Sequence, residues 1–224
     1  IGDKGLGRLI EPDELLGVLN KQKGKIIVTS GPTYEEIDDV KVVTNKSSGK
    51  QGRALAIELS ARGYEIIYIH SASIDHIPGL DNVSFHSSND LKNKILENIN
   101  NTDAIFMTAA VSDFTVKKSS GKISRSNGNI TLEFIPNEDI IASIKTSYPE
   151  IKCIAFSAQV DDELNFNKIN TKNVDYLVIN NILKNKFGSD TNKVSLIDQQ
   201  HLIFESEELD KNEISRDILN ALEY

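Results

Sequence analysis

Short apolar segments that alternate with helical segments are the feature that most constrains the fold of this 224-residue chain. Residues 103–111, "DAIFMTAAV", are strongly apolar and are typical of a parallel strand buried on both faces of a sheet. Because the connections are short, the pattern predicts an α/β fold: a Rossmann-like, mostly parallel sheet with helices on both faces. The predicted strands are 25–30, 64–70, 82–87, 103–111, 151–158 and 174–180; the predicted helices are 52–62, 90–100, 136–147, 162–171 and 207–222; a hairpin is predicted at 193–206.

Residues 114–135 break this alternation because they are polar and basic. Within them, Asn127-Gly128 lies between "KIS" and "ITLEF", and this dipeptide is typical of a tight turn between two strands. We therefore expect a protruding β-hairpin arm beside a strand end. Such an arm either covers a ligand, clasps a partner or is a solvated excursion.

Composition and charge exclude several classes of protein. The net charge is -8 and the pI is near 5.1, which argues against a protein that follows nucleic acid along a broad basic face. No apolar run approaches the ~18 residues of a membrane-spanning helix, and we expect a cytoplasmic protein without a signal peptide. The single cysteine, Cys153, excludes an intrachain disulfide and a multi-cysteine metal site, and its apolar flanks predict a buried thiol.

Residues 47–52, "SSGKQG", directly precede a predicted helix and resemble half of a phosphate-binding loop. Neither the glycine spacing of a dinucleotide fingerprint nor that of a P-loop is present. Gly49 and Gly52 would still leave backbone amides open to an anion at the positive end of the helix. The alternative is an ordinary helix start with serine residues that cap it.

Two segments, one at a strand end and one in a turn, carry carboxylates that could hold Mg²⁺ through water. Asp113 follows the buried strand in "TAAVSDF", and Asp190 lies in "KFGSD". For either aspartate, formation of a turn is the alternative explanation. The four histidines lack the spacing of a metal site, so the metal ligands stay unknown at this point.

The motifs together resemble a known family, the phosphopantothenoylcysteine synthetases. The stretches "SGPTYEEID", "TNKSSGKQG", "TAAVSDF", "GKISR", "NEDII", "AFSAQ", "NVDYLVINN" and "FGSDTNKVSLI" occur in the order and approximate spacing of that family. The resemblance implies that residues 24–224 ligate 4'-phosphopantothenate to L-cysteine through an acyl-nucleotide intermediate, with release of pyrophosphate. CTP is the expected nucleotide, ATP is possible, and Mg²⁺ is the expected cofactor. Residues 1–23 are similar to the linker and tail of a preceding decarboxylase domain, whose FMN site would lie outside this chain.

The resemblance also implies roles for individual residues. Asn45 and Lys122 match catalytic positions: the amide of Asn45 would contact the phosphopantothenate carboxyl, and Lys122 lies in a basic flap. Ala109, Ala110 and Asp113 match substrate contacts that are completed across a homodimer interface. The expected nucleotide-binding residues are Gly31, Ser47, Gly49, Gly52, Asp113, Lys122, Glu138, Asp139, Ile140, Ile141, Phe156, Lys168, Lys172 and Asn181.

This chain departs from the usual family pattern at Tyr34, Lys41, Ser124 and Gln159. At position 41 a lysine replaces the common arginine, and this change loses two-pronged recognition of phosphate. Two other functions stay open from the sequence: an NAD(P)-dependent oxidoreductase, which would lack its glycine fingerprint, and a nucleotide sensor without catalytic activity.

Overall fold

A computed structural model describes residues 23–160, 164, 166–181 and 189–224 of the chain. Its centre is an eight-stranded sheet in which six neighbouring strands are parallel and the last two at one edge are antiparallel. In spatial order the strands are β13 (Leu202–Glu205), β12 (Val194–Ile197), β10 (Tyr176–Asn181), β9 (Lys152–Gln159), β6 (Thr102–Met107), β1 (Lys25–Ser30), β4 (Glu65–Ser71) and β5 (Asp81–Phe85). The predicted α/β fold with a mostly parallel sheet is therefore confirmed.

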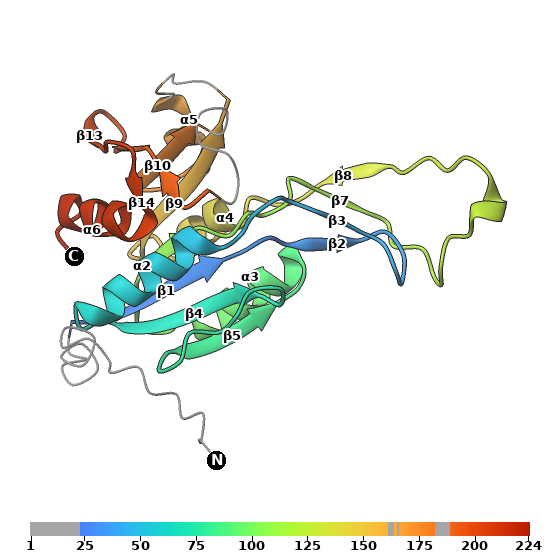
Figure 1. The fold of residues 1–224 in the computed structure, drawn as a ribbon, viewed down its shortest axis with the longest axis horizontal. Helices are drawn as coiled ribbons and strands as arrows, with labels where there is room; N and C mark the ends of the chain where they lie inside the picture. Colours follow the sequence, from blue (N-terminus) through green and yellow to red (C-terminus); the bar gives the residue numbers. More distant parts are fainter. Residues whose placement is uncertain (1–22, 161–163, 165, 182–188) are drawn as a thin grey trace, which may run out of the picture.

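Helices cover both faces of this sheet, as Figure 1 shows. The apolar side chains of α2 (Lys50–Ala61) and α6 (Lys211–Ala221) pack on one face against Ile26 and Val28 of β1. Those of α3 (Ser88–Asn98), α4 (Ile140–Ser147) and α5 (Phe166–Lys172) belong to the core on the other face, which includes Ile27. Because consecutive residues of a strand point to opposite faces, this alternation along β1 builds both cores.

The chain order places a crevice between β1 and β6. From β1 the chain runs outward to β4 and β5, then crosses back to β6 and continues to β9 and β10 on the other side. Ligands in open parallel sheets bind outside the carboxyl ends of the strands at such a reversal. The isolated bridge between Pro32 and Ala110 joins the segments that leave these two strand ends.

A protruding arm extends from this end of the sheet (Figure 1), as predicted, but it contains two hairpins. One pairs β7 (Phe114–Val116) with β8 (Phe134–Pro136), and the other, which was not predicted, pairs β2 (Tyr34–Glu36) with β3 (Val42–Thr44). The prediction of a strand turn at Asn127-Gly128 is wrong. A short 3₁₀ turn, η1 (Arg125–Asn127), lies there, and the paired strands are confined to the base of the arm.

Several predicted boundaries also shift because side chains cap the helices. Asp139 caps α4 by accepting from the Ala142 amide, so the helix begins at Ile140 and not at residue 136. Asp210 and Glu213 form a reciprocal capping box, and α6 therefore begins after residue 210. The short strands β11 (Thr191–Asn192) and β14 (Leu209–Asp210), which pair with each other, were not predicted, and β14 lies in the region predicted as helix. None of the helices that the structure describes has both the length and the apolar character needed to cross a bilayer.

Candidate active site

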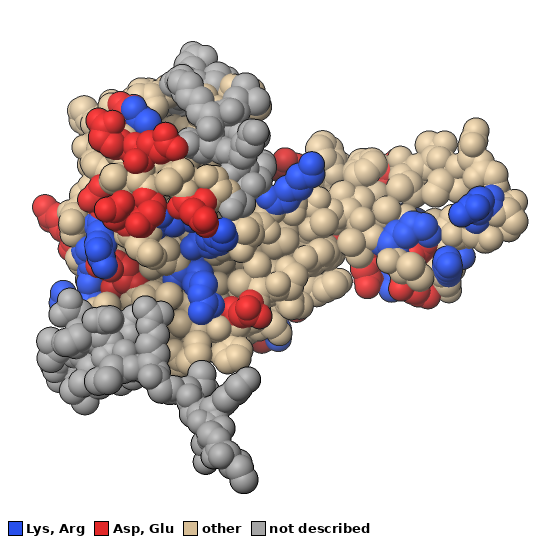
Figure 2. Space-filling model, in the orientation of Figure 1, with Lys and Arg blue, Asp and Glu red and all other residues tan. Residues whose placement is uncertain are grey.

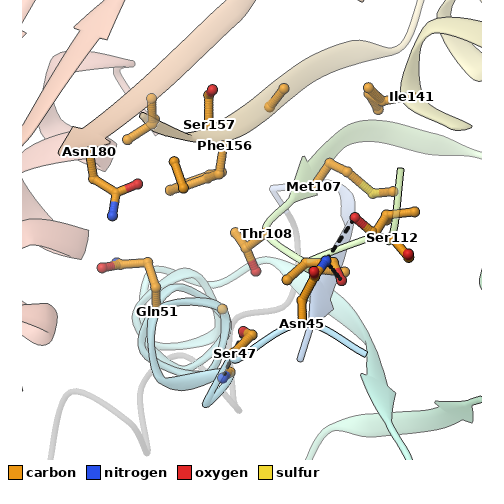
Figure 3. Close-up of a pocket in the computed structure, with 18 of the residues that line it drawn as sticks. Asn45, Ser47, Gln51, Met107, Thr108, Ser112, Ile141, Phe156, Ser157 and Asn180 are labelled. Atoms are coloured by element: carbon orange, nitrogen blue, oxygen red, sulfur yellow. Dashed lines mark hydrogen bonds between the residues drawn. The ribbon is translucent and has the colours of Figure 1, made fainter. Parts of the chain in front are cut away.

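A cavity of about 710 Å³ lies at the carboxyl ends of the central strands, at the reversal between β1 and β6. Four chain segments form most of its lining: residues 44–52, 107–113, 137–141 and 155–158. Figure 3 shows side chains from these segments converging with Asn180 of β10. Of the predicted site residues, the cavity brings together Asn45, Ser47, Gly49, Gly52, Ala109, Ala110, Asp113, Glu138, Asp139, Ile140, Ile141, Phe156, Lys168 and Lys172.

The start of α2 supplies one end of the cavity. Gly49 is the residue before the helix; its φ of 69° is left-handed, and as a glycine it has no side chain to cap the helix amides. The Ser30 hydroxyl donates to the Gly49 carbonyl at 2.8 Å and fixes this turn against the end of β1. The result is a helix N-terminus whose uncapped amides line the cavity, which is the arrangement that favours an anion.

Close packing also explains two of the predicted glycines. A Cβ on Gly52 would lie 2.8 Å from Ser30 and even closer to the Thr108 hydroxyl. A Cβ on Gly31 would lie 2.7 Å from Ile74 and from Ser71. Gly31 has a φ of +87° and lies in the turn after β1, outside the cavity lining, so its contact with a nucleotide stays a prediction.

Asn45 ties the loop after β3 to the segment after β6. Its side-chain nitrogen donates to the carbonyls of Ala110 at 3.1 Å and Val111 at 3.0 Å, drawn as dashed lines in Figure 3. Two carbonyl neighbours fix the orientation of the amide, because only the nitrogen can donate to them. The sequence reasoning expected a donor at Asn45, whereas here the donors are engaged within the chain and Oδ1 is the atom turned away from these carbonyls.

Acidic residues at the start of α4, each paired with a lysine, form another part of the cavity lining. Lys172 contacts Asp139 at 3.0 Å between Nζ and Oδ2, and Lys92 contacts Glu138 at 2.6 Å between Nζ and Oε2. The hydrogen bond from Lys92 lowers the pKa of the Glu138 carboxyl. Phe156 of β9 also lines the cavity and offers an aromatic surface to a flat ring.

Further lysines, which sequence reasoning did not assign to the site, line the end of the cavity near α2. Lys46 and Lys50 come from the loop and the first turn of α2, and Lys211 comes from the first turn of α6. Lys50 Nζ lies 2.5 Å from Asp190 Oδ1, and this contact lowers the pKa of Asp190. Burial lowers the pKa of Lys211, whose ammonium donates to the Ser189 carbonyl.

Lys50 was visible as part of "SSGKQG", but Lys211 had no local signal because α6 lies 150 residues or more away in sequence. Other polar residues line the cavity although the sequence analysis gave them no role, and several of them lie inside the quoted motifs: Gln51, Thr108, Asn137, Ser157, Asn180, Thr191 and Asn192. Among the described residues, no group of three or more His, Cys, Asp or Glu could hold a metal ion.

Besides Gly31, two predicted residues, Asn181 and Lys122, lie outside the cavity lining. Asn180 lines the cavity and Asn181 does not, because adjacent residues of β10 point to opposite faces. Lys122 lies on the arm with an exposed side chain and is not part of the cavity of its own chain. Lys168, Lys172 and residues 138–141 line the cavity, and their roles in nucleotide binding stay predictions.

Residues 21–224 match the family described as the DNA/pantothenate metabolism flavoprotein C-terminal domain. The chain belongs to this family. The resemblance to phosphopantothenoylcysteine synthetases seen in the sequence is thereby confirmed. A crystal structure of the C-terminal domain of a coenzyme A biosynthesis bifunctional protein, CoaBC, shares 27% identity with a TM-score of 0.75, over 90% of this chain and 95% of that one.

Two curated relatives match almost the whole chain. The CoaBC protein of Bacillus subtilis (strain 168) is 32% identical over 238 residues, which cover 99% of this chain and 59% of the relative. A protein named cysteine/cysteine sulfinic acid decarboxylase, from an unknown prokaryotic organism, is 30% identical over 246 residues, which cover 99% of this chain and 67% of the relative. This chain therefore spans about 60% to two thirds of the length of these relatives.

Proposed function

We propose that this domain joins 4'-phosphopantothenate to L-cysteine in coenzyme A biosynthesis, with CTP as the favoured nucleotide. The observation that carries the proposal is that one cavity combines the start of α2, lysines from three elements and Asn45. We call the two hydrogen bonds from the Asn45 side chain to the carbonyls of Ala110 and Val111 the Asn45 clamp. Membership of a family whose relatives include CoaBC proteins supports the same assignment.

In the first step the carboxylate of phosphopantothenate attacks the α-phosphorus of the nucleotide, and the bond to pyrophosphate breaks. The amides at the start of α2, with Lys50 and Lys211, would hold the charge of the departing pyrophosphate. Lys168 and Lys172 would approach the nucleotide from the wall of α4 and α5, with Phe156 beside the base. Because these groups lie on helices and strands packed in the core, they are oriented before the substrates bind.

In the second step the amine of cysteine attacks the acyl carbon, and the nucleoside monophosphate leaves. The Asn45 clamp would keep the loop at residues 44–48 and the segment at residues 109–113 in register around the acyl group. Ala109 and Ala110 have small side chains there, which lets the acyl chain lie close to the backbone.

Mg²⁺ is the cofactor that we propose for the first step, where it would supply positive charge to the triphosphate. A cation bound to phosphates needs only one or two protein carboxylates. Asp113 fits this requirement because it lines the cavity with an exposed side chain. Asp190 is a second candidate, since its carboxylate lies beside Lys50 at the phosphate end.

The arm leads us to propose a homodimer. Large apolar side chains on it are 45–64% exposed, and such a group on one projection is typical of an interaction surface. These are Val40, Phe114, Ile130, Phe134 and Ile135. A second copy would cover them, and the exposed Lys122 would then serve the partner's cavity. We also propose that the longer protein carries a decarboxylase half with FMN, and that it acts in the cytoplasm.

The test is incubation of the protein with CTP or ATP, Mg²⁺ and phosphopantothenate, first without cysteine. We expect pyrophosphate and the mass of the acyl-nucleotide, followed by the amide product when cysteine is added. Release of no pyrophosphate with either nucleotide would contradict a ligase and favour a nucleotide sensor. Reduction of NAD(P) with any substrate in place of pyrophosphate release would favour an oxidoreductase.

A further inference from the structure

The turn of the β2–β3 hairpin is hydrogen-bonded to the long loop that joins β7 to β8. We call these contacts the clasp: they join residues 37–41 of the turn to residues 119–123 of the loop. The Ser119 amide donates to the Ile37 carbonyl at 2.9 Å, and the Gly121 amide donates to Asp39 Oδ2 at 3.0 Å. The clasp thus joins two segments that are about 80 residues apart in sequence.

Asp38 is the centre of the clasp. Its side chain is inaccessible to solvent and accepts from the amides of Val40 and Lys41 at 2.7 Å, from the Ile123 amide at 2.9 Å and from Lys41 Nζ at 2.5 Å. The hydrogen bond from Lys41 holds the pKa of Asp38 far below its ordinary value. A buried carboxylate with four donors stays ionised and well ordered.

Lys41 completes the clasp from the other side. Its Nζ also donates to the Ile123 carbonyl at 3.2 Å, so both backbone polar groups of Ile123 are bound. Lys41, which stands where the family commonly has arginine, therefore stabilises the clasp in this chain. The ammonium is engaged within the arm and not with the cavity of its own chain.

Lys122 lies between the two anchored residues Gly121 and Ile123, and its side chain is exposed. In the long loop between Val116 and Phe134, the secondary structure that is described consists of the short 3₁₀ turn η1 (Arg125–Asn127). Without the clasp, the backbone at Lys122 would sample many conformations, and ordering it on binding would cost conformational entropy. Figure 2 shows Lys and Arg side chains beside acidic ones on this outer part of the arm.

We propose that Asp38 is a positioning residue that sets the direction of Lys122, with Lys41 as its partner. The inference rests on the proposed function, in which Lys122 pairs with a phosphate of a substrate bound by the second copy. A rigid presentation of this lysine lowers the entropy lost when the phosphate binds. Asp38 itself touches no substrate in this account and acts through the backbone on either side of Lys122.

The experiment is a double-mutant cycle with kcat/KM as the readout, in which D38N, K122A and D38N/K122A are compared with the parent. D38N should lower kcat/KM by about 10- to 100-fold, because it removes the charge from several hydrogen bonds. In the K122A background it should change kcat/KM by less than about twofold, because two residues that act as a unit are not additive. K41M, which alters a half-exposed residue, is a second variant with the same expected pattern.

E36Q is the matched control on the same hairpin, since Glu36 pairs with the exposed Lys118, which keeps its second ion-pair partner Asp39 in the variant. It should leave kcat/KM and the dimer mass at parental values. Trypsin cleavage after Lys122 gives an independent readout of the clasp that needs no activity. Cleavage should be faster in D38N and K41M than in E36Q, while the melting temperature of the domain stays within a few degrees.

Additive losses in D38N/K122A would overturn the positioning role and leave the proposed function intact. Full activity of K122A would overturn the role of Lys122 and the inference with it. If the parent shows no ligase activity, the proposed function fails, and trypsin cleavage still tests the clasp. An unchanged cleavage rate in both D38N and K41M overturns the inference on its own.

Discussion

Gly52→Ala is the substitution that best separates packing from ligand approach at the start of α2. In a helix, replacing glycine with alanine ordinarily stabilises a protein by about 0.5–1 kcal/mol. Here the new Cβ would lie 2.8 Å from buried Ser30 and closer still to the Thr108 hydroxyl, which donates to the Thr29 carbonyl. Overpacking costs about 1–3 kcal/mol, and loss of the Thr108 hydrogen bond costs about 1 kcal/mol. We therefore expect a net loss of about 1–3 kcal/mol in the free energy of unfolding.

Urea unfolding followed by circular dichroism measures this change directly. Thr108→Ala is the matched relief variant, because it removes the hydroxyl that the new Cβ would meet. Gly52→Ala should cost less in the Thr108→Ala background than in the parent, by about 0.5–1 kcal/mol. If Gly52→Ala instead raises the stability, the glycine is required for the ligand alone and the packing argument is refuted.

Three further predictions follow from the site and the core. Burial raises the pKa of the Cys153 thiol to about 12, so iodoacetamide at pH 8 should label it only after unfolding in urea; labelling of the native protein would contradict this. Burial lowers the pKa of Lys211 below the ordinary lysine value of about 10.4, so its ammonium loses its charge at a lower pH and nucleotide affinity should fall earlier as the pH rises. Lys211→Arg should move this alkaline fall in affinity to higher pH. An unchanged pH profile in that variant would exclude Lys211 from phosphate binding. Asn45→Asp would turn a carboxylate oxygen toward the carbonyls of Ala110 and Val111 and lose both hydrogen bonds, so the acyl-nucleotide should accumulate and kcat/KM should fall about 10- to 100-fold, further than in Asn45→Ala; unchanged turnover would remove Asn45 from the mechanism.

The body of the fold could be predicted because local pattern and tertiary context agree there. Strands such as β1 and β6 are buried on both faces, so a plain apolar run identifies them. Three-residue strands carry no such pattern: β2 and β3 pair with each other, and β2 packs against β7. Asn127-Gly128 misled the prediction because its turn chemistry is satisfied by a 3₁₀ turn, without strands on either side.

The candidate site was predicted where its residues lie close together in sequence. Ser47 to Gly52 and Ala109 to Asp113 were found as segments, and the structure places them in one cavity. Lys211 could not be found in this way because it comes from a distant helix that packs on α2. Asn181 was placed one residue from the lining position, since the sequence does not fix which face of β10 meets the cavity. Of residues 1–23, predicted as linker and tail, residues 1–22 lie outside the described part of the chain.

The most direct test of the central claim is transfer of oxygen from the carboxylate to the nucleotide. Phosphopantothenate labelled with ¹⁸O in its carboxyl group is incubated with the protein, CTP, Mg²⁺ and cysteine, and the nucleoside monophosphate is analysed by mass spectrometry. Attack of the carboxylate on the α-phosphorus predicts one ¹⁸O atom in the monophosphate for each amide formed. Amide formation with an unlabelled monophosphate, or with release of a nucleoside diphosphate, would contradict the account.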